Sequence, residues 1–193
     1  GTTSWGYDAL HRQVSETDPR NNTTTRTYND KGQIASETDA AGNATTYAYY
    51  AATGWLQSVA NALNKSVSYS YDLKGQKLSE SGDATYPVEF VYNVHGELIQ
   101  HKTFRTGDLP DVTTWTYDEA SGLLASKTYA DGKGVSYEYD LAGRMLRRTW
   151  ARSVSVEDES GGTVSVPLET DYAYDAFGDL LSISYSDNAA PSV

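Results

Sequence analysis

Cysteine is absent from this 193-residue chain. Its absence excludes a disulfide scaffold, a cysteine-ligated zinc site and a cysteine nucleophile. Long apolar runs are absent too, because no stretch approaches the roughly 20 residues that cross a bilayer as a helix. No signal peptide is visible after Gly1. We therefore expect no membrane span, and we interpret the chain as a fragment of a larger protein.

Positive charge is scarce, since 15 Lys and Arg residues stand against 26 Asp and Glu residues and give a formal net charge of −11. Such a surface repels phosphates, and no basic cluster with interleaved aromatic residues occurs, so we expect no nucleic acid partner. The histidines are His11, His95 and His101, and none has the spacing of a zinc-ligand pair. We predict no metal site and no cofactor.

Phenylalanine and methionine are rare, with three copies and one copy, yet tyrosine occurs 16 times. Disordered chains are poor in aromatic residues, so we expect a folded chain. Tyrosine joins an apolar ring to a polar tip, which suits the half-exposed surface of a β-sheet. No segment shows helical periodicity, whereas residues 44–49 and similar stretches alternate with period two, as strands do.

A tyrosine recurs about every 21 residues and anchors a repeating unit. The residue two positions earlier is aromatic in every unit except the second, where it is Arg26, and such residues share one face of a strand. We predict that the aromatic pairs of adjacent units stack into columns across the sheet. The anchors are Tyr7, Tyr28, Tyr49, Tyr71, Tyr92, Tyr117, Tyr139 and Tyr174.

Turn-forming residues follow each anchor. Asp or Asn comes next in every unit except the third, which has Tyr50, and such side chains fold back onto their own backbone and start turns. Glycine follows and accepts the positive φ of a tight turn, with His11 in its place in the first unit. The units of Gly54 and Gly122 carry one extra turn residue. The Asp residues are Asp8, Asp72, Asp118, Asp140 and Asp175, and the glycines are Gly32, Gly54, Gly75, Gly96, Gly122, Gly143 and Gly178.

An apolar residue such as Ile34 opens the return strand, although Val14 and Leu78 stand one position later in the first and fourth units. A second turn, as at residues 39–43, closes each unit. Eight units of two strands give roughly 16 antiparallel strands, and open twisted sheets rarely exceed about 10. We therefore predict an all-β fold in which tandem antiparallel β-hairpin repeats form one long, strongly curved sheet. This sheet would be a partial turn of a spiral β-shell or barrel, with about eight hairpin units in a single array over residues 1–193.

Two units contain insertions. Residues 103–115 form a longer hairpin tip, and residues 151–168 form a protruding hairpin with an acidic tip at residues 157–162. The run Glu157-Asp158-Glu159 is the best candidate for a cation site, but an exposed tip is a poor cage, so a solvated loop is the preferred interpretation. The tail after Ser186 is expected to fray.

The motif Tyr-Asp, with glycine three residues after Asp and an apolar residue two further on, resembles the YD-repeat or RHS-repeat family. The resemblance extends from Tyr7 to Tyr185. Members include bacterial Rhs proteins, the C components of insecticidal toxin complexes, wall-associated proteins and animal teneurins. The resemblance implies a β-sheet that spirals into a hollow shell, often around a C-terminal toxin. The family's self-cleavage segment is not recognisable, so self-processing is not expected.

The repeated residues have functional alternatives to a structural role. The turn carboxylates could ligate calcium or act as an acid–base pair in glycoside hydrolysis, but they recur at one repeat position, which favours turn formation. A Ser-His-Asp triad stays an alternative, because the three residues of a triad come together only in the folded chain, although no motif supports one. The aromatic rows could bind sugars or extended peptide, and we favour the packed face of the sheet.

We predict a non-catalytic structural segment of a large secreted or cell-surface bacterial YD/RHS-repeat protein. This segment would form part of a shell that encloses or displays an associated domain, possibly a toxin. Its partners would be neighbouring repeats of the parent chain and an encapsulated C-terminal domain. The alternative is an adhesion module that binds carbohydrate or a surface protein through exposed Tyr and Trp, and a hydrolase is the third hypothesis. Free sheet edges would also permit edge-to-edge self-association.

Overall fold

The computed structural model describes residues 1–105, 107, 109–157 and 160–186. The acidic pair Asp158 and Glu159, the hairpin-tip residues Thr106 and Asp108, and the tail from Asp187 therefore lie outside the described residues. The described part contains strands and turns but no helix, so it contains no helix able to cross a membrane.

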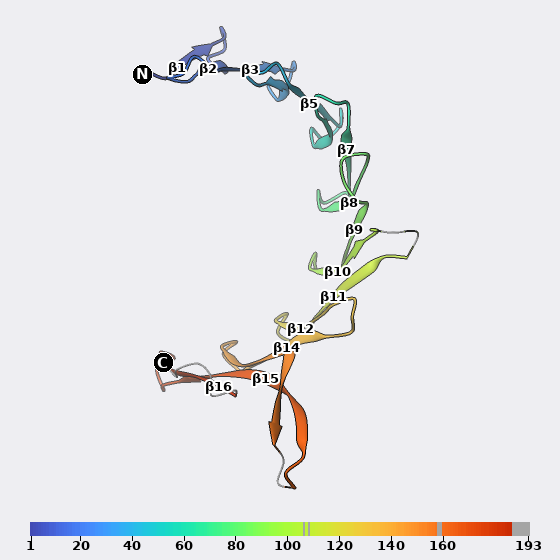
Figure 1. Cartoon of the computed structure of the whole chain (residues 1–193), viewed down its shortest axis with the longest axis vertical. Helices are drawn as coiled ribbons and strands as arrows, with labels where there is room; N and C mark the ends of the chain where they lie inside the picture. The colour runs from blue at the N-terminus through green and yellow to red at the C-terminus, as the bar shows by residue number, and fades with distance from the viewer. Residues whose placement is uncertain (106, 108, 158–159, 187–193) are drawn as a thin grey trace. The chain divides into compact units, whose positions relative to one another are not determined.

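Sixteen strands follow one another in chain order within one antiparallel sheet, which begins at β1 and ends at β16 and so is open (Figure 1). The all-β fold and the strand number are therefore confirmed. The strands are β1 (Ser4–Tyr7), β2 (Gln13–Thr17), β3 (Thr23–Tyr28), β4 (Ile34–Thr38), β5 (Ala44–Tyr49), β6 (Leu56–Ala60), β7 (Ser66–Tyr71), β8 (Lys77–Ser81), β9 (Val88–Tyr92), β10 (Leu98–Thr103), β11 (Asp111–Tyr117), β12 (Leu124–Thr128), β13 (Gly134–Tyr139), β14 (Met145–Glu157), β15 (Thr163–Tyr174) and β16 (Leu180–Tyr185).

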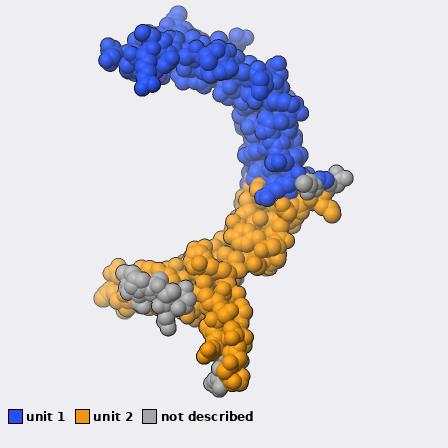
Figure 2. Space-filling view, viewed as in Figure 1, with its two compact units in different colours: residues 1–90, 103–108 blue, residues 91–102, 109–193 orange. Residues whose placement is uncertain are grey.

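The chain divides into two compact units, which Figure 2 distinguishes by colour. Unit 1 consists of residues 1–90 and 103–108, and unit 2 consists of residues 91–102 and 109–193. Each unit contains several complete repeats, so the construction of the repeat can be followed within either one.

The two faces of the sheet differ in chemistry because side chains alternate along each strand. In β5, Tyr47 and Tyr49 are half-buried on one face, whereas Thr46 and Ala48 are exposed on the other. On that second face, hydroxyl groups of neighbouring strands form hydrogen bonds of 2.6–2.7 Å. These bonds join Thr27 to Ser36, Ser70 to Ser79 and Thr116 to Ser126. One face is therefore aromatic and the other is small and polar.

The turn after each anchoring tyrosine, the anchor turn, has one backbone geometry in most repeats. At Asp140, its N–H donates to the Arg144 carbonyl at 2.9 Å, and the Gly143 N–H donates to the Asp140 carbonyl at 3.0 Å. Gly143 has φ 79°, and the register shifts at Tyr139, as in a type I turn followed by a glycine bulge. The closing turns share this pattern, with Asn21 and Asn64 in the left-handed conformation.

Two anchor turns are one residue longer, as the sequence predicts. The Tyr50 N–H donates to the Trp55 carbonyl and the Asp118 N–H to the Leu123 carbonyl, so four residues lie between the bonded pair instead of the usual three. One closing turn begins at an aromatic residue, since the Tyr129 N–H donates to the Lys133 carbonyl.

The later apolar residues Val14 and Leu78 do not shift the start of their return strands. Tyr7 pairs with Gln13 and Tyr71 with Lys77, as Tyr28 pairs with Ile34, so all of these return strands begin in the same register. The backbone hydrogen bonds of the turn fix the register, and a polar side chain at the first position does not displace it.

Very little of the described chain is fully buried. Its core consists of Val135 on β13 and of Leu168 and Thr170 on β15. The accessible surface is 13058 Å², against about 9,000 Å² for a compact monomer of this mass. The sheet therefore depends on contacts between successive repeats instead of a deep core.

The insertion at residues 151–168 forms the ends of β14 and β15, which pair from Ser153 with Pro167 to Glu157 with Thr163. The register shifts between Thr149 and Ser153, where the hairpin leaves the regular sheet. Trp150 lies at this junction and donates its indole N–H to the Thr170 hydroxyl at 2.9 Å. Beyond this shift, β14 and β15 continue as a two-stranded hairpin.

Opposite substitutions at two turn residues with positive φ, Gly143 and His11, test the role of backbone strain. Gly143→Ala should lower the free energy of unfolding by about 1 kcal/mol because an L-residue is strained at positive φ. An added Cβ would lie 3.6 Å from Leu123, so packing does not oppose the change. His11→Gly should have the opposite effect, since His11 already has φ 59°. Urea denaturation measures both, and equal signs for the two variants would contradict the interpretation.

Candidate functional site: the interface between repeats

The acidic residue of each anchor turn binds its own turn. One carboxylate oxygen of Asp140 accepts the backbone N–H groups of Ala142 and Arg144, both at 2.9 Å. The other oxygen accepts the Arg144 Nε at 2.7 Å. Asp8 repeats these bonds with Leu10 and Arg12. Corresponding backbone bonds occur at Asn29, Asp72, Asn93 and Asp175, and in the closing turns at Asp18, Asp39 and Asn61.

These hydrogen bonds favour the ionised carboxylate. The Arg144 backbone N–H has the largest effect and lowers the pKa of Asp140, and the Arg12 backbone N–H does the same for Asp8. Hydrogen bonds within the turn also lower the pKa of Asp18, Asp39 and Asp118. A carboxylate held this way has ordinary turn chemistry, and the raised pKa of a general acid is the reverse of what is found.

Each of four anchoring tyrosines bonds to the preceding repeat. The hydroxyl of Tyr28 donates to the Gln13 carbonyl at 2.6 Å, and that of Tyr49 donates to the Ile34 carbonyl at 2.9 Å. The same contact joins two further pairs, Tyr117 to Leu98 at 3.1 Å and Tyr174 to Met145 at 2.9 Å. Every acceptor is the first residue of a return strand. We call this contact the tyrosine latch.

Burial accompanies the latch. Burial raises the pKa of Tyr49 and Tyr117, and also that of Tyr71 and Tyr139, because the phenolate would lose hydration. The neutral phenol is also the form that donates the hydrogen bond. Protonation and repeat packing therefore favour the same state of the side chain.

The residue directly after the turn glycine reaches the next repeat, and sequence reasoning missed this position. Arg12 and Arg144 lie over the rings of the next anchors, Tyr28 and Tyr174, at 4.5 and 4.8 Å. Gln33 instead donates to the Gly54 carbonyl at 2.7 Å. Consensus reading overlooks the position because its side chain changes from repeat to repeat. Its constant place after the glycine is the signal that could have revealed it.

Cations interleave the aromatic rows, which the predicted ring-on-ring columns did not anticipate. Lys77 lies over Phe90 at 5.0 Å, Lys127 over Trp115 at 5.1 Å, and Arg148 over Trp150 at 3.6 Å. Aromatic pairs of adjacent repeats are separated by a return strand, so they lie about 9.6 Å apart, beyond the roughly 7 Å limit of ring contact. Side chains of the intervening strand occupy that space. Direct ring contacts join Tyr71 to Tyr50 and to Trp55.

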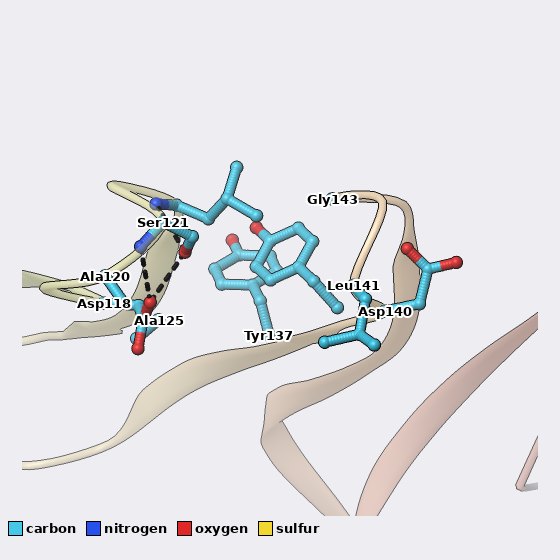
Figure 3. Close-up of a pocket in the computed structure, with 10 residues that line it drawn as sticks. Asp118, Ala120, Ser121, Ala125, Tyr137, Asp140, Leu141 and Gly143 are labelled. Carbon is cyan, nitrogen blue, oxygen red and sulfur yellow. Dashed lines mark hydrogen bonds between the residues drawn. The ribbon is translucent and has the colours of Figure 1, made fainter.

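Two apolar clefts open where the longer anchor turns meet the next turn. The first, of about 420 Å³, lies between the turns at Tyr50 and Asp72 and is lined by Trp55, Tyr71 and Leu73. The second, of about 460 Å³, lies between the turns at Asp118 and Asp140. In Figure 3, Tyr137 stands between these two turns and Leu141 lies at the rim.

The residues that the sequence singles out take constant places in the repeat. The anchors Tyr7, Tyr28, Tyr49, Tyr71, Tyr92, Tyr117, Tyr139 and Tyr174 each end a strand. The glycines Gly32, Gly54, Gly75, Gly96, Gly122, Gly143 and Gly178 all have positive φ. They are spread along one edge of the sheet, and no group of three metal-ligating side chains gathers within the described residues.

A family model described as the Teneurin YD-shell matches residues 27–160, which is more than half of the chain. The chain belongs to the Teneurin YD-shell family. The resemblance to YD repeats inferred from the Tyr-Asp-Gly motif is thereby confirmed. No curated protein sequence matches the chain.

Solved structures share the fold of this YD-shell chain. The crystal structures of TcdB2-TccC3 and of TcdB2-TccC3-Cdc42 each match it with a TM-score of 0.72 and 21% identity, over 95% of this chain and 11% of theirs. The Photorhabdus luminescens Tc holotoxin pore matches with a TM-score of 0.64 and 24% identity, over 85% of this chain and 9% of its own. The YD-shell chain thus spans about a tenth of the length of these structures.

The tyrosine latch can be tested by removing one hydroxyl. Tyr49→Phe should lower the free energy of unfolding by about 1 kcal/mol, because the Ile34 carbonyl loses its partner. Tyr47→Phe is the matched control, since the Tyr47 hydroxyl bonds to no residue that the structure describes. Urea denaturation compares the two, and an equal loss in both variants would show that the latch contributes nothing.

Acid should weaken the turns. The folded pKa of these turn carboxylates lies below the unfolded value of roughly 3.9, so their contribution is present above that pH and is lost as pH falls through the folded pKa. The triple variant Asp18→Asn, Asp39→Asn, Asp140→Asn should keep the turns, as Asn61 does, and show a shallower loss of stability below pH 4. Denaturation midpoints at pH 7, 4 and 3 measure this loss, with Asp30→Asn as the charge control. If the midpoint of the triple variant fell with pH as steeply as that of the wild type, these carboxylates would not be the source of the acid sensitivity.

Proposed function

We propose that this chain is a non-catalytic wall segment of a secreted or cell-surface bacterial YD/RHS-repeat protein, and that its array covers residues 1–193. The tyrosine latch carries the proposal, because it joins four of the repeats to the one before through the same main-chain atom. Such a wall extends by adding repeats, and each new repeat finds its partner already formed.

The chemistry of the repeats also supports a structural role. The carboxylates of the anchor turns are engaged by their own backbone N–H groups and have lowered pKa values where a shift is resolved. Phe90 and Trp115 are half-buried beneath cations of neighbouring strands, Lys77 and Lys127. Both groups are therefore used to hold the wall together.

We further propose that the wall encloses another domain of the same parent polypeptide. The family match and the likeness in fold to the TcdB2-TccC3 structures support this proposal. The unusually large accessible surface supports it as well, since a sheet with so little core of its own needs further repeats or an enclosed domain against it.

Limited proteolysis of the intact parent polypeptide tests enclosure. We expect an enclosed domain to resist trypsin until the urea concentration at which the wall unfolds, as followed by circular dichroism. The double variant Tyr49→Phe, Tyr117→Phe should lower both midpoints together, whereas Tyr47→Phe should move neither. Rapid cleavage of every other domain in the native parent, or midpoints that move independently, would overturn the proposal.

A further inference from the structure

Arg148 is the one half-buried arginine that pairs with no carboxylate among the residues that the structure describes. Its Nε atom is buried and donates no hydrogen bond, and a buried donor without an acceptor is rare in folded proteins. The other half-buried arginines form ion pairs of 2.6–2.9 Å, which join Arg12 to Asp8, Arg26 to Glu37, Arg144 to Asp140 and Arg147 to Asp171.

Two guanidinium groups lie beside a single ring, that of Trp150. The guanidinium carbon of Arg148 is 3.6 Å from the centre of this ring, and that of Arg152 is 5.9 Å from it. The ring is held in place because its N–H donates to the Thr170 hydroxyl at 2.9 Å, and Thr170 is almost fully buried. The two like charges repel each other, and neither pairs with a carboxylate of the described chain. The result is a fixed aromatic platform whose positive charge is not neutralised.

The carboxylates of this region belong to the opposite face of the sheet. Glu169 and Asp171 have carboxylate oxygens 3.6 and 2.6 Å from the Nε of Arg147, and Glu138 lies opposite Arg147 in the β13–β14 pairing. Arg147 and Arg148 are consecutive strand residues, so their side chains point to opposite faces. The polar face therefore balances the charge of its arginine, whereas the aromatic face does not.

The preceding repeat presents another cation of the same kind on this face. The Lys127 ammonium lies 5.1 Å from the centre of the Trp115 ring, and within the described residues it pairs with no carboxylate. Lys127 and Arg148 lie opposite β13 residues that are two positions apart. The spacing of the strands and this offset place the two positions about 12 Å apart.

We propose that the aromatic face around Trp150 binds an acidic peptide segment of a separate protein. One carboxylate of the segment binds Arg148 and Arg152, and another binds Lys127. In an extended peptide, residues four apart lie on one side and about 13 Å apart, which matches the separation of the cations. A carboxylate is planar and fits the fork of a guanidinium group, and it is the partner of every other half-buried arginine that the structure describes.

A short acidic segment suits this surface better than a long polyanion does. The formal net charge of −11 repels nucleic acid and sulfated polysaccharide along the whole chain. Two carboxylates experience mainly the nearby cations, because physiological salt screens exposed charges beyond about 8 Å. The proposal concerns binding to the 193-residue chain itself and does not depend on enclosure of another domain.

Titration of the isotope-labelled chain, followed by nuclear magnetic resonance, tests the location of the site. The probe is a pentapeptide with glutamate at both ends, serine and threonine between them, and blocked termini. We expect the indole N–H signals of Trp115 and Trp150 to shift, and those of Trp5 and Trp55 in unit 1 to stay in place. The matched peptide with glutamine at both ends should shift none of them. No shift up to about 10 mM peptide, equal shifts of all four signals, or binding of the glutamine peptide overturns the proposal.

Substitutions test the two arginines. Arg148→Gln and Arg152→Gln should each raise the dissociation constant of the glutamate peptide about tenfold, because each removes a charge-assisted hydrogen bond. Arg20→Gln is the matched control, since Arg20 is an exposed arginine of a closing turn in unit 1. Arg152 is exposed too, so its variant retains a test even if Arg148→Gln unfolds the repeat, which circular dichroism detects. An equal loss in Arg20→Gln, an unchanged affinity in Arg152→Gln, or tighter binding of heparin than of the peptide contradicts the proposal.

Discussion

The hydrogen bond from the anchoring tyrosine to the preceding repeat is the contact on which the structure depends. Its geometry requires that the return strand begin at a fixed place, and the turn supplies that place. Asp140 binds the turn backbone, Gly143 takes the left-handed conformation, and Met145 then begins the strand whose carbonyl Tyr174 reaches. A local turn motif is thereby converted into a contact between repeats.

A second contact between repeats adds variety to this constant frame. The position after the turn glycine contacts the next repeat through arginine in some repeats and through glutamine, tryptophan or leucine in others. The latch has the same form at Tyr28, Tyr49, Tyr117 and Tyr174, whereas the side chain at this position varies. The two apolar clefts arise where the variation coincides with a longer turn.

A sheet with almost no core is stabilised differently from a globular domain. Apolar burial is spread thinly over many half-buried tyrosines, and cations lie over several of their rings, at distances of 4.5 to 5.9 Å. Stability then becomes a sum of repeat and interface terms. Substitutions in one repeat should accordingly act on that repeat and its neighbours.

The sequence by itself determined the strands, the anchor turns and the family, because these depend on side chains near one another in the chain. The spacing of the tyrosines and the Asp and glycine residues after them predicted each hairpin. The extra residues before Gly54 and Gly122 predicted the longer turns. Only the tertiary structure decided the register at Gln13 and Lys77, where backbone bonds overrule the hydrophobic pattern. It also decided that cations separate the aromatic pairs, and that Trp55 and Leu123 line clefts. Most of those contacts join residues more than ten positions apart, and their distances follow from strand spacing, which no local pattern records.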